Sequence, residues 1–218
     1  MNESETSVKT DDLIRALAED APRGPSLGAG LMAGLLAGFM GAVVLFGGLL
    51  SVRAGMPALL ADPRVLLKLA MGVTLAAAGG ALALRLSRPG ADATWNIRVM
   101  ALPLFIVLFG VGVEMATTPE GTWLPGLVGR YSSYCLLFVP LLSLPVLVAG
   151  LMALRRGAPT HPAGAGAAAG LLAAGIGASL YTFHCPDDSP FFVLVWYGLA
   201  IAMVTLAGAL AGRRLLAW

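Results

Sequence analysis

The sequence predicts an all-α membrane protein: a polytopic bundle of six transmembrane helices, preceded by a short amphipathic helix. Hydrophobic residues make up 58% of the 218 residues and charged residues only 12%, too few to cover a soluble surface. Six apolar stretches come close to the ~20 residues that a helix needs to cross a bilayer. They cover residues 27–50, 66–86, 98–117, 133–154, 163–183 and 191–212. Each is expected to be helical, because lipid offers no hydrogen-bond partner to an open backbone.

The polar start of the chain predicts a division into two parts. We expect residues 1–26 to form an arm outside the membrane and residues 27–218 to form the six-helix transmembrane domain. The arm is acidic, whereas a cleaved signal peptide begins with a basic region, so we expect the first span to be retained. The sequence contains no nucleotide-binding loop and no stretch long enough for a soluble catalytic domain. We therefore expect no enzymatic activity, no cofactor and no direct contact with nucleic acid.

The distribution of basic residues predicts the orientation of the bundle. With a cytoplasmic N-terminus, ten of the fourteen Lys and Arg residues lie on the cytoplasmic side and four on the outer side. The outer four are Arg53, Arg64, Lys68 and Arg130. Because an excess of basic residues marks cytoplasmic loops, six spans place both termini in the cytoplasm.

Within the arm, a short amphipathic helix is predicted from Thr10 to about Ala21, just ahead of Pro22. Hydroxyl and carboxylate side chains suit the start of a helix, and here they are Thr10, Asp11 and Asp12. An apolar stripe at helical spacing follows, formed by Leu13, Ile14, Leu17 and Ala18. A helix that lies on a membrane usually has a basic polar face, whereas this one is acidic. We therefore expect the stripe to dock in a protein groove rather than on lipid.

The two cysteines, Cys135 and Cys185, are predicted to lie close together at the outer side. Cys135 opens the fourth span and Cys185 closes the fifth, and only the short segment 155–162 joins these spans. The two spans should therefore pack as an antiparallel hairpin with neighbouring outer ends. Helix axes lie about 8–10 Å apart, while a disulfide needs Cα atoms about 5.5 Å apart. A bond is thus compatible with this placement where the fifth helix frays before Pro186.

Several interpretations of this cysteine pair remain open. The thiols could form a static disulfide, act as two small buried apolar groups, or respond to redox agents or metals. Their shared outer position favours the third interpretation. Thiolate and imidazole together suit soft or borderline ions such as zinc or cadmium, which makes Cys135, Cys185 and His184 candidate metal ligands, with added oxygen from Asp187 and Asp188. The spacing of these residues matches no standard zinc motif.

Other polar and aromatic residues lie near the ends of the spans. Glu114, near the outer end of the third span, raises the hypothesis of a proton or cation path. Because no span carries an acid or base near its centre, the sequence argues against a transporter. Aromatic residues at span ends are typical of an interfacial belt, and here they are Trp123, Tyr131, Tyr134, Trp196 and Tyr197.

Glycines at small-xxx-small spacing occur in the first and last spans. They are Gly30, Gly34, Gly38, Gly208 and Gly212. This spacing lets helix backbones approach closely, and tight packing within one bundle explains it as well as dimerisation does. The spacing therefore leaves the oligomeric state open.

Four segments together resemble the NrsF-type anti-sigma factors, along essentially the whole chain. They are VKTDDLIRALA (residues 8–18), YCL (134–136), HCPDDSP (184–190) and WY (196–197). Members of this family are six-span proteins of the bacterial inner membrane that hold an extracytoplasmic-function sigma factor inactive. The resemblance implies that the arm sequesters such a sigma factor. It also implies that Cys135 and Cys185 sense metal or oxidant stress and trigger release.

Two rival functions follow from the residues alone. A membrane thiol–disulfide oxidoreductase would also use a pair of outer cysteines, but such enzymes usually carry a CxxC pair, which is absent here. A small transporter is disfavoured by the lack of polar residues at the centres of the spans. The expected partners are therefore an extracytoplasmic-function sigma factor and membrane lipid.

Overall fold

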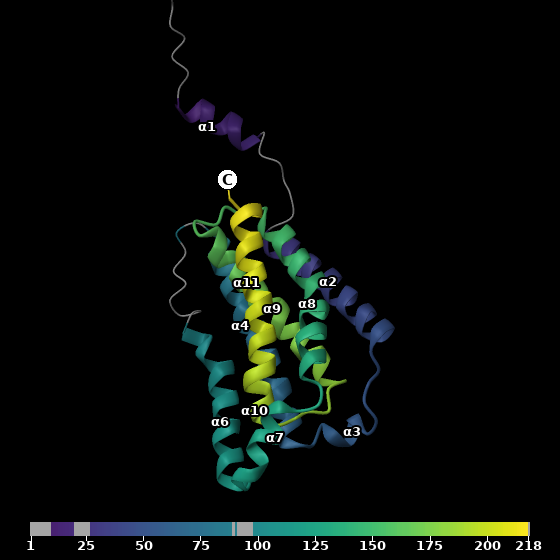
Figure 1. Cartoon of the computed structure of the whole chain (residues 1–218). Helices are drawn as coiled ribbons and strands as arrows, with labels where there is room; N and C mark the ends of the chain where they lie inside the picture. The colour runs from purple at the N-terminus through teal and green to yellow at the C-terminus, as the bar shows by residue number, and fades with distance from the viewer. Residues whose placement is uncertain (1–9, 20–26, 89, 91–97, 218) are drawn as a thin grey trace, which may run out of the picture.

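The computed structural model of the protein describes residues 10–19, 27–88, 90 and 98–217, and the regular structure in them is entirely helical. The longer helices stand side by side in a bundle (Figure 1). They are α2 (Leu27–Leu49), α4 (Pro63–Leu86), α6 (Ala101–Thr117), α8 (Ser132–Leu154), α9 (Pro162–Thr182) and α11 (Gly198–Leu215). The shorter ones are α1 (Thr10–Glu19), α3 (Met56–Leu59), a 3₁₀ turn (Glu120–Thr122), α7 (Trp123–Val128), α10 (Pro190–Phe192) and a π-helix (Val193–Tyr197).

Five helical stretches of the described chain are long and apolar enough to cross a membrane, so the chain has the character of a membrane protein. They are Met32–Leu49, Pro63–Leu86, Ser132–Leu154, Pro162–Thr182 and Pro190–Leu215. The predicted third span, 98–117, corresponds to α6, which has 17 residues. At ~1.5 Å per residue such a helix rises about 26 Å, slightly less than the ~30 Å of a hydrocarbon core. A sixth crossing by α6 therefore stays a prediction.

The central helix of the bundle is α9, a segment rich in alanine and glycine that packs against α11, α4 and α8. Its glycines allow these close approaches on different faces. A Cβ added at Gly170 would lie 2.8 Å from Thr205 Cα of α11, and one at Gly175 would lie 2.8 Å from Ala76 Cα of α4. A Cβ at Gly177 would lie 2.8 Å from the Val139 oxygen of α8. The three neighbours can surround α9 at these distances because these positions lack side chains.

The small-xxx-small glycines also pack inside the chain. A Cβ at Gly38 of α2 would lie 2.8 Å from Val146 Cα of α8, and Gly34 of α2 faces Ala149 of the same helix. Gly208 and Gly212 of α11 face Gly166 of α9. Packing within one bundle therefore accounts for both glycine patterns, although the surroundings of Gly30 lie outside the described residues.

The two ends of the bundle differ in chemistry. At one end, which we call the arginine end, α4, α8 and α11 finish and α9 begins. Its basic side chains are Arg85, Arg88, Arg155, Arg156, Arg213 and Arg214. At the opposite end, which we call the cysteine end, α8 begins, with Cys135 in its first turn, and α9 finishes just before Cys185. In Figure 1 the arginine end is uppermost, with the C-terminus, and α7 and α10 lie near the bottom.

The margins of the bundle are formed by α2 and α6. α6 packs mainly against α4, and α2 packs mainly against α8, so that much of the surface of α2 is exposed in the isolated chain. α2 runs antiparallel to α8, because Gly34 lies near Ala149 and Ala153 while Gly38 lies near Val146. α2 therefore begins at the arginine end and finishes at the cysteine end. The arm, which precedes α2 in the chain, is connected at the arginine end.

Candidate functional site

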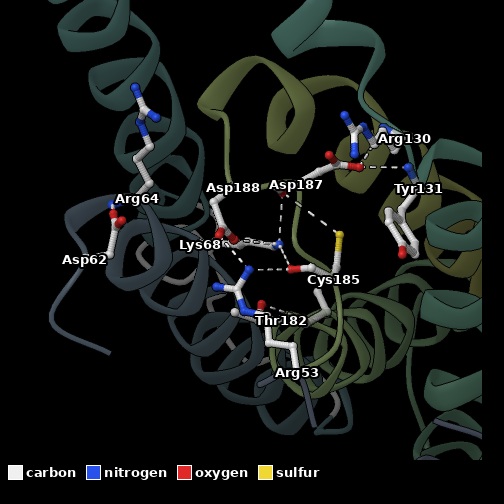
Figure 2. Close-up of polar contacts among 11 residues, drawn as sticks. Arg53, Asp62, Arg64, Lys68, Arg130, Tyr131, Thr182, Cys185, Asp187 and Asp188 are labelled. Atoms are coloured by element: carbon white, nitrogen blue, oxygen red, sulfur yellow. Dashed lines mark hydrogen bonds and ion pairs between the residues drawn. The ribbon is translucent and has the colours of Figure 1, made fainter. Parts of the chain in front are cut away.

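The candidate site is the link between α9 and α10, residues 183–189, which we call the Cys185 segment. Pro186 lacks the amide hydrogen that a continuing helix would need, so the chain leaves the helical path after α9, and Pro190 opens α10. The carbonyl oxygens of Cys185 and Asp187 accept hydrogen bonds from distant side chains instead. Figure 2 shows the side chains of Lys68 and Arg53 reaching these oxygens.

Lys68 of α4 reaches the Cys185 segment with a completely buried side chain, at 0% exposure. Its Nζ donates to the carbonyl oxygens of Cys185 (3.2 Å) and Asp187 (3.1 Å) and to Oδ1 of Asp188 (3.1 Å). These three acceptors match the three donors of an ammonium group. The ring of Tyr197 adds a cation–π contact, 5.0 Å from Nζ. A buried charge is costly unless it is paired and hydrogen-bonded, and Lys68 meets both conditions.

A second cation, Arg53, ties the chain after α2 to the same segment. Its Nη1 donates to the Cys185 oxygen (3.1 Å) and to Oδ2 of Asp188 (2.7 Å). Its backbone N–H donates to the Phe183 oxygen at 2.9 Å. Nearby, Nδ1 of His184 lies 2.8 Å from the Ser51 oxygen. The link after α2, residues 50–55, is thus attached to the Cys185 segment through both backbone and side chains.

Asp187 connects the segment to the start of α8. Its Oδ2 accepts hydrogen bonds from the backbone N–H groups of Arg130 (2.9 Å) and Tyr131 (2.7 Å). The turn that presents these amides contains Gly129 at φ +60°, a conformation that favours glycine. A Cβ on Gly129 would also come within 2.9 Å of the same Asp187 oxygen. The backbone ahead of Cys135 is therefore fixed to the residues that follow Cys185.

Both cysteines lie in one buried cluster at the cysteine end. Cys135 and Cys185 are 0% exposed, both thiols are free, and they share the cluster with Val139, Tyr181 and Tyr197. Sγ of Cys185 lies 4.0 Å from the Asp187 oxygen. Burial raises the pKa of the Cys185 thiol, and the positive charge of Lys68 acts against that rise. The structure thus brings together the two thiols that the topology predicts to be neighbours.

The third candidate metal ligand, His184, has other contacts. Its Nδ1 faces the Ser51 oxygen, and its ring packs 5.9 Å from that of Tyr181 and 6.4 Å from that of Tyr131. Among the described residues, no group of three or more His, Cys, Asp or Glu side chains is arranged to hold a metal ion. The Asp187 carboxylate accepts hydrogen bonds from backbone amides, and the Asp188 carboxylate accepts them from Arg53 and Lys68. We assign no metal ligands in this structure.

Glu114 is held by a cation rather than left free along a proton path. Its two carboxylate oxygens accept hydrogen bonds from Nη2 (2.8 Å) and Nε (3.0 Å) of Arg64, one turn before Lys68 on α4. This bidentate pairing at the cysteine end gives Glu114 a structural partner.

The assignment of Tyr197 to an interfacial belt is wrong. Tyr197 is completely buried, with Lys68 above its ring, and it lies at the end of the π-helix Val193–Tyr197. Such wide turns often occur at functional sites. Trp196, its neighbour in the π-helix, donates from Nε1 to the Leu127 oxygen at 2.8 Å. The π-helix therefore joins the start of the last span to α7 and to the cluster around the cysteines.

Lys68 and Arg53 are the site residues that sequence reasoning missed. The positive-inside count treats both only as outer basic residues. One signal was available for Lys68: an ionisable residue inside an apolar span is costly and commonly functional. No comparable signal exists for Arg53, which lies in a loop.

At the other end of the chain, α1 spans Thr10–Glu19. Leu13 and Ile14 are 52% and 59% exposed, and the neighbouring Thr10, Asp11 and Asp12 are exposed as well. Leu17 belongs to the helix, but its side chain lies outside the described residues, as does the predicted helix end at Ala21. The apolar stripe of the arm is thus uncovered at both of its described positions.

Comparison with known proteins gives consistent matches along the chain. The family described as "Negative regulator of sigma F" (NrsF) matches residues 17–218. The "Anti-sigma-F factor NrsF" of Caulobacter vibrioides (strain NA1000 / CB15N) is 37% identical over 217 residues, covering 97% of this chain and 100% of that protein. The "Probable anti-sigma-F factor NrsF" of Azospira oryzae is 34% identical over 222 residues, with coverage of 97% and 100%. No solved structure matches the chain.

Proposed function

The chain belongs to the NrsF family of negative regulators of sigma F, and we propose that it sequesters an extracytoplasmic-function sigma factor through its arm. A member of this family is a regulator rather than an enzyme. The proposed location is the bacterial inner membrane, with six spans and both termini in the cytoplasm. Release of the sigma factor follows when Cys135 and Cys185 react under metal or oxidant stress on the outer side.

The exposed stripe of α1 supports the proposed role of the arm, residues 1–26. Leu13 and Ile14 project from a short acidic helix and are more than half exposed in the isolated chain. Apolar residues at helical spacing bind readily in a groove of a partner protein. The acidic residues Asp11 and Asp12 would be repelled by an anionic lipid surface, which favours a protein partner.

The observation that carries the proposal is the separation of two sites along one helix. The arm is connected to the start of α2 at the arginine end, whereas the buried thiols lie at the cysteine end. α2 finishes at Leu49, and Ser51 and Arg53 just beyond it bond the Cys185 segment. A single helix therefore connects the proposed sensor to the proposed binding arm.

The same connections offer a route for release. α2 packs mainly against α8, which carries Cys135, and its end is attached to the segment that carries Cys185. A disulfide or a thiolate–metal bond between the cysteines would pull α8 and the Cys185 segment into a new relative position. α2, whose other neighbours are few, would follow and shift the arm. A ligand or bond drives such a change by preferring one of the two arrangements.

Co-purification tests the proposed contact. The full-length protein, solubilised from membranes, is expected to carry a sigma factor that is identified among the bound proteins. Leu13→Asp places a charge in the apolar contact, and losing one anchor of such a contact costs about 1–3 kcal/mol, which lowers the affinity roughly 5- to 150-fold and so lowers the recovered sigma factor.

Arg15→Ala is the matched control, because Arg15 belongs to α1 but not to its apolar stripe. Its recovery of sigma factor should equal that of the unchanged protein, at equal amounts of protein in the membrane. If Leu13→Asp recovers as much sigma factor as the unchanged protein does, the contact lies outside the arm.

A further inference from the structure

Two cations and one carboxylate meet at the backbone of Cys185 (Figure 2). Lys68 and Arg53 both donate to the Cys185 oxygen, and each also bonds one oxygen of Asp188. The second acid of the segment, Asp187, directs its carboxylate to the backbone amides of Arg130 and Tyr131 instead. Lys68 and Arg53 are thus fixed at the backbone of Cys185, and Asp188 is the carboxylate that pairs with both of them.

Lys68 is the cation that shares a contact with the thiol. The Asp187 oxygen is 3.1 Å from Nζ of Lys68 and 4.0 Å from Sγ of Cys185, so one oxygen atom contacts both groups. Cys135, Tyr181 and Tyr197 share the buried cluster around the thiol, and their side chains are uncharged in ordinary form. Charges interact more strongly in such buried surroundings than in water.

We propose that Lys68 is a positioning residue for Cys185: the Lys68 side chain holds the backbone of residues 185–188 and keeps a positive charge beside the reacting sulfur. This inference rests on the proposed sensing role of Cys185. The thiolate is the nucleophilic form of cysteine, and a neighbouring cation stabilises it. A residue that only fixed the backbone would need hydrogen-bond donors but no charge, whereas the charged ammonium group of Lys68 is buried here at 0% exposure.

The charge beside the sulfur can be measured with two thiol reagents of similar size. In full-length protein carrying Cys135→Ser, Cys185 is treated with methanethiosulfonates that carry either a sulfonate or a trimethylammonium group. In both cases the thiolate attacks the sulfenyl sulfur, a protein disulfide forms and methanesulfinate leaves. The ratio of the two rates reports the local charge, because access and the thiolate fraction affect both rates alike.

Lys68→Met should lower the ratio of the anionic to the cationic reagent's rate roughly tenfold at low salt, because it removes one charge several ångströms from the sulfur. Lys68→Arg restores the charge and should restore the ratio. Arg64→Met, one turn earlier on α4 and more exposed, is the matched control and should leave the ratio unchanged. Equal changes of both rates in Lys68→Met, with an unchanged ratio, would reduce Lys68 to a structural anchor and overturn the inference.

Asp188→Asn keeps the inference testable if Lys68→Met does not fold. It removes the carboxylate that pairs with both Lys68 and Arg53, so the ratio should rise. A ratio that stays the same or falls in Asp188→Asn would contradict an influence of the Lys68–Asp188 pair on the charge at Cys185.

The rate measurement requires no sigma factor, so it separates this inference from the proposed function. A shifted ratio together with normal induction in cells carrying Cys185→Ser would support the role of Lys68 and refute sensing by Cys185. An unshifted ratio together with lost induction in those cells would refute the role of Lys68 and leave sensing intact.

Discussion

At the scale of single residues, the setting of Cys185 depends on the prolines that flank it. Pro186 ends the helical path and Pro190 opens α10, so the oxygens of Cys185 and Asp187 in the non-helical link are free to accept hydrogen bonds from Lys68. The short segment is then held by side chains and amides from three other parts of the chain. A change in the position of the thiol therefore affects several elements at once.

The two cysteines should behave as one unit in cells. Cys135→Ser and Cys185→Ser are each expected to abolish induction of the sigma factor's target genes by an oxidant, because one thiol has no partner in either variant. The double variant should match the single variants rather than add to them, as residues of one unit do. The measurement is target-gene expression with and without oxidant. Normal induction in the double variant would leave the cysteines with a structural role only.

The sequence predicts the positions of the two cysteines better than it predicts their polar neighbours. Cys135 and Cys185 can be placed at one end of the bundle because a short loop joins their helices. Lys68 and Asp188 are 120 positions apart, and no periodicity or spacing relates them. Their pairing depends on how α4 lies against α9, which only the folded chain defines.

At the scale of elements, α2 is the helix that joins the proposed sensor to the arm. It has fewer neighbours than α9, and its link at residues 50–55 is bonded to the Cys185 segment. An element with few buried contacts moves at lower cost than a central one. This combination fits α2 for transmitting a change between the two ends.

Arg53→Met should uncouple the two ends while leaving the thiols reactive. The substitution removes the bonds from Arg53 to the Cys185 oxygen and to Asp188 but keeps its backbone bond to Phe183. Coupling between distant sites is typically worth 1–3 kcal/mol, so oxidant-driven release should fall roughly fivefold or more. Release of sigma factor and loss of free thiol are measured in the same sample.

Arg130→Met is the control for this variant, because Arg130 contacts the segment through its backbone amide, which the substitution retains. It should release the sigma factor as the unchanged protein does. If Arg53→Met also releases normally at equal thiol oxidation, the signal does not pass through the link after α2.

The long helices follow hydropathy closely, whereas the short ones do not. The predicted spans 133–154 and 163–183 correspond to α8 (Ser132–Leu154) and α9 (Pro162–Thr182). α3, α7 and the π-helix Val193–Tyr197 are not predicted, because elements of a few residues depend on tertiary contacts such as that of Trp196 with Leu127. The predicted third span begins at residue 98, whereas α6 begins at Ala101.

At the scale of the whole molecule, the bundle is organised around α9. Its glycines let three helices approach one axis, and this arrangement brings the ends of α4, α8 and α9 together at the cysteine end. Helix association in membranes relies on close packing of small residues, because lipid is as apolar as the side chains. The position of Lys68 beside Cys185 is thus a consequence of glycine packing along α9.

Gly170→Ala should destabilise the bundle, because the added Cβ would lie 2.8 Å from both Thr205 Cα and the Val204 oxygen. Overpacking of this kind costs about 1–3 kcal/mol. Gly112→Ala in α6 is the control, since a Cβ there meets nothing within 4 Å. It should be neutral or stabilise by up to about 1 kcal/mol through helix propensity. Thermal unfolding in detergent compares the two variants, and equal unfolding temperatures would refute tight packing at Gly170.

The most direct test of the account applies an oxidant to one side of the membrane and measures the sigma factor on the other. Spheroplasts that expose the outer face, with sigma factor bound, are treated with a thiol oxidant that cannot cross the membrane. The sigma factor left on the membrane is then measured after lysis. We predict that it falls in the unchanged protein and stays constant in the Cys135→Ser, Cys185→Ser double variant. Full retention in the unchanged protein after both thiols are oxidised, or equal release from the double variant, would contradict the account.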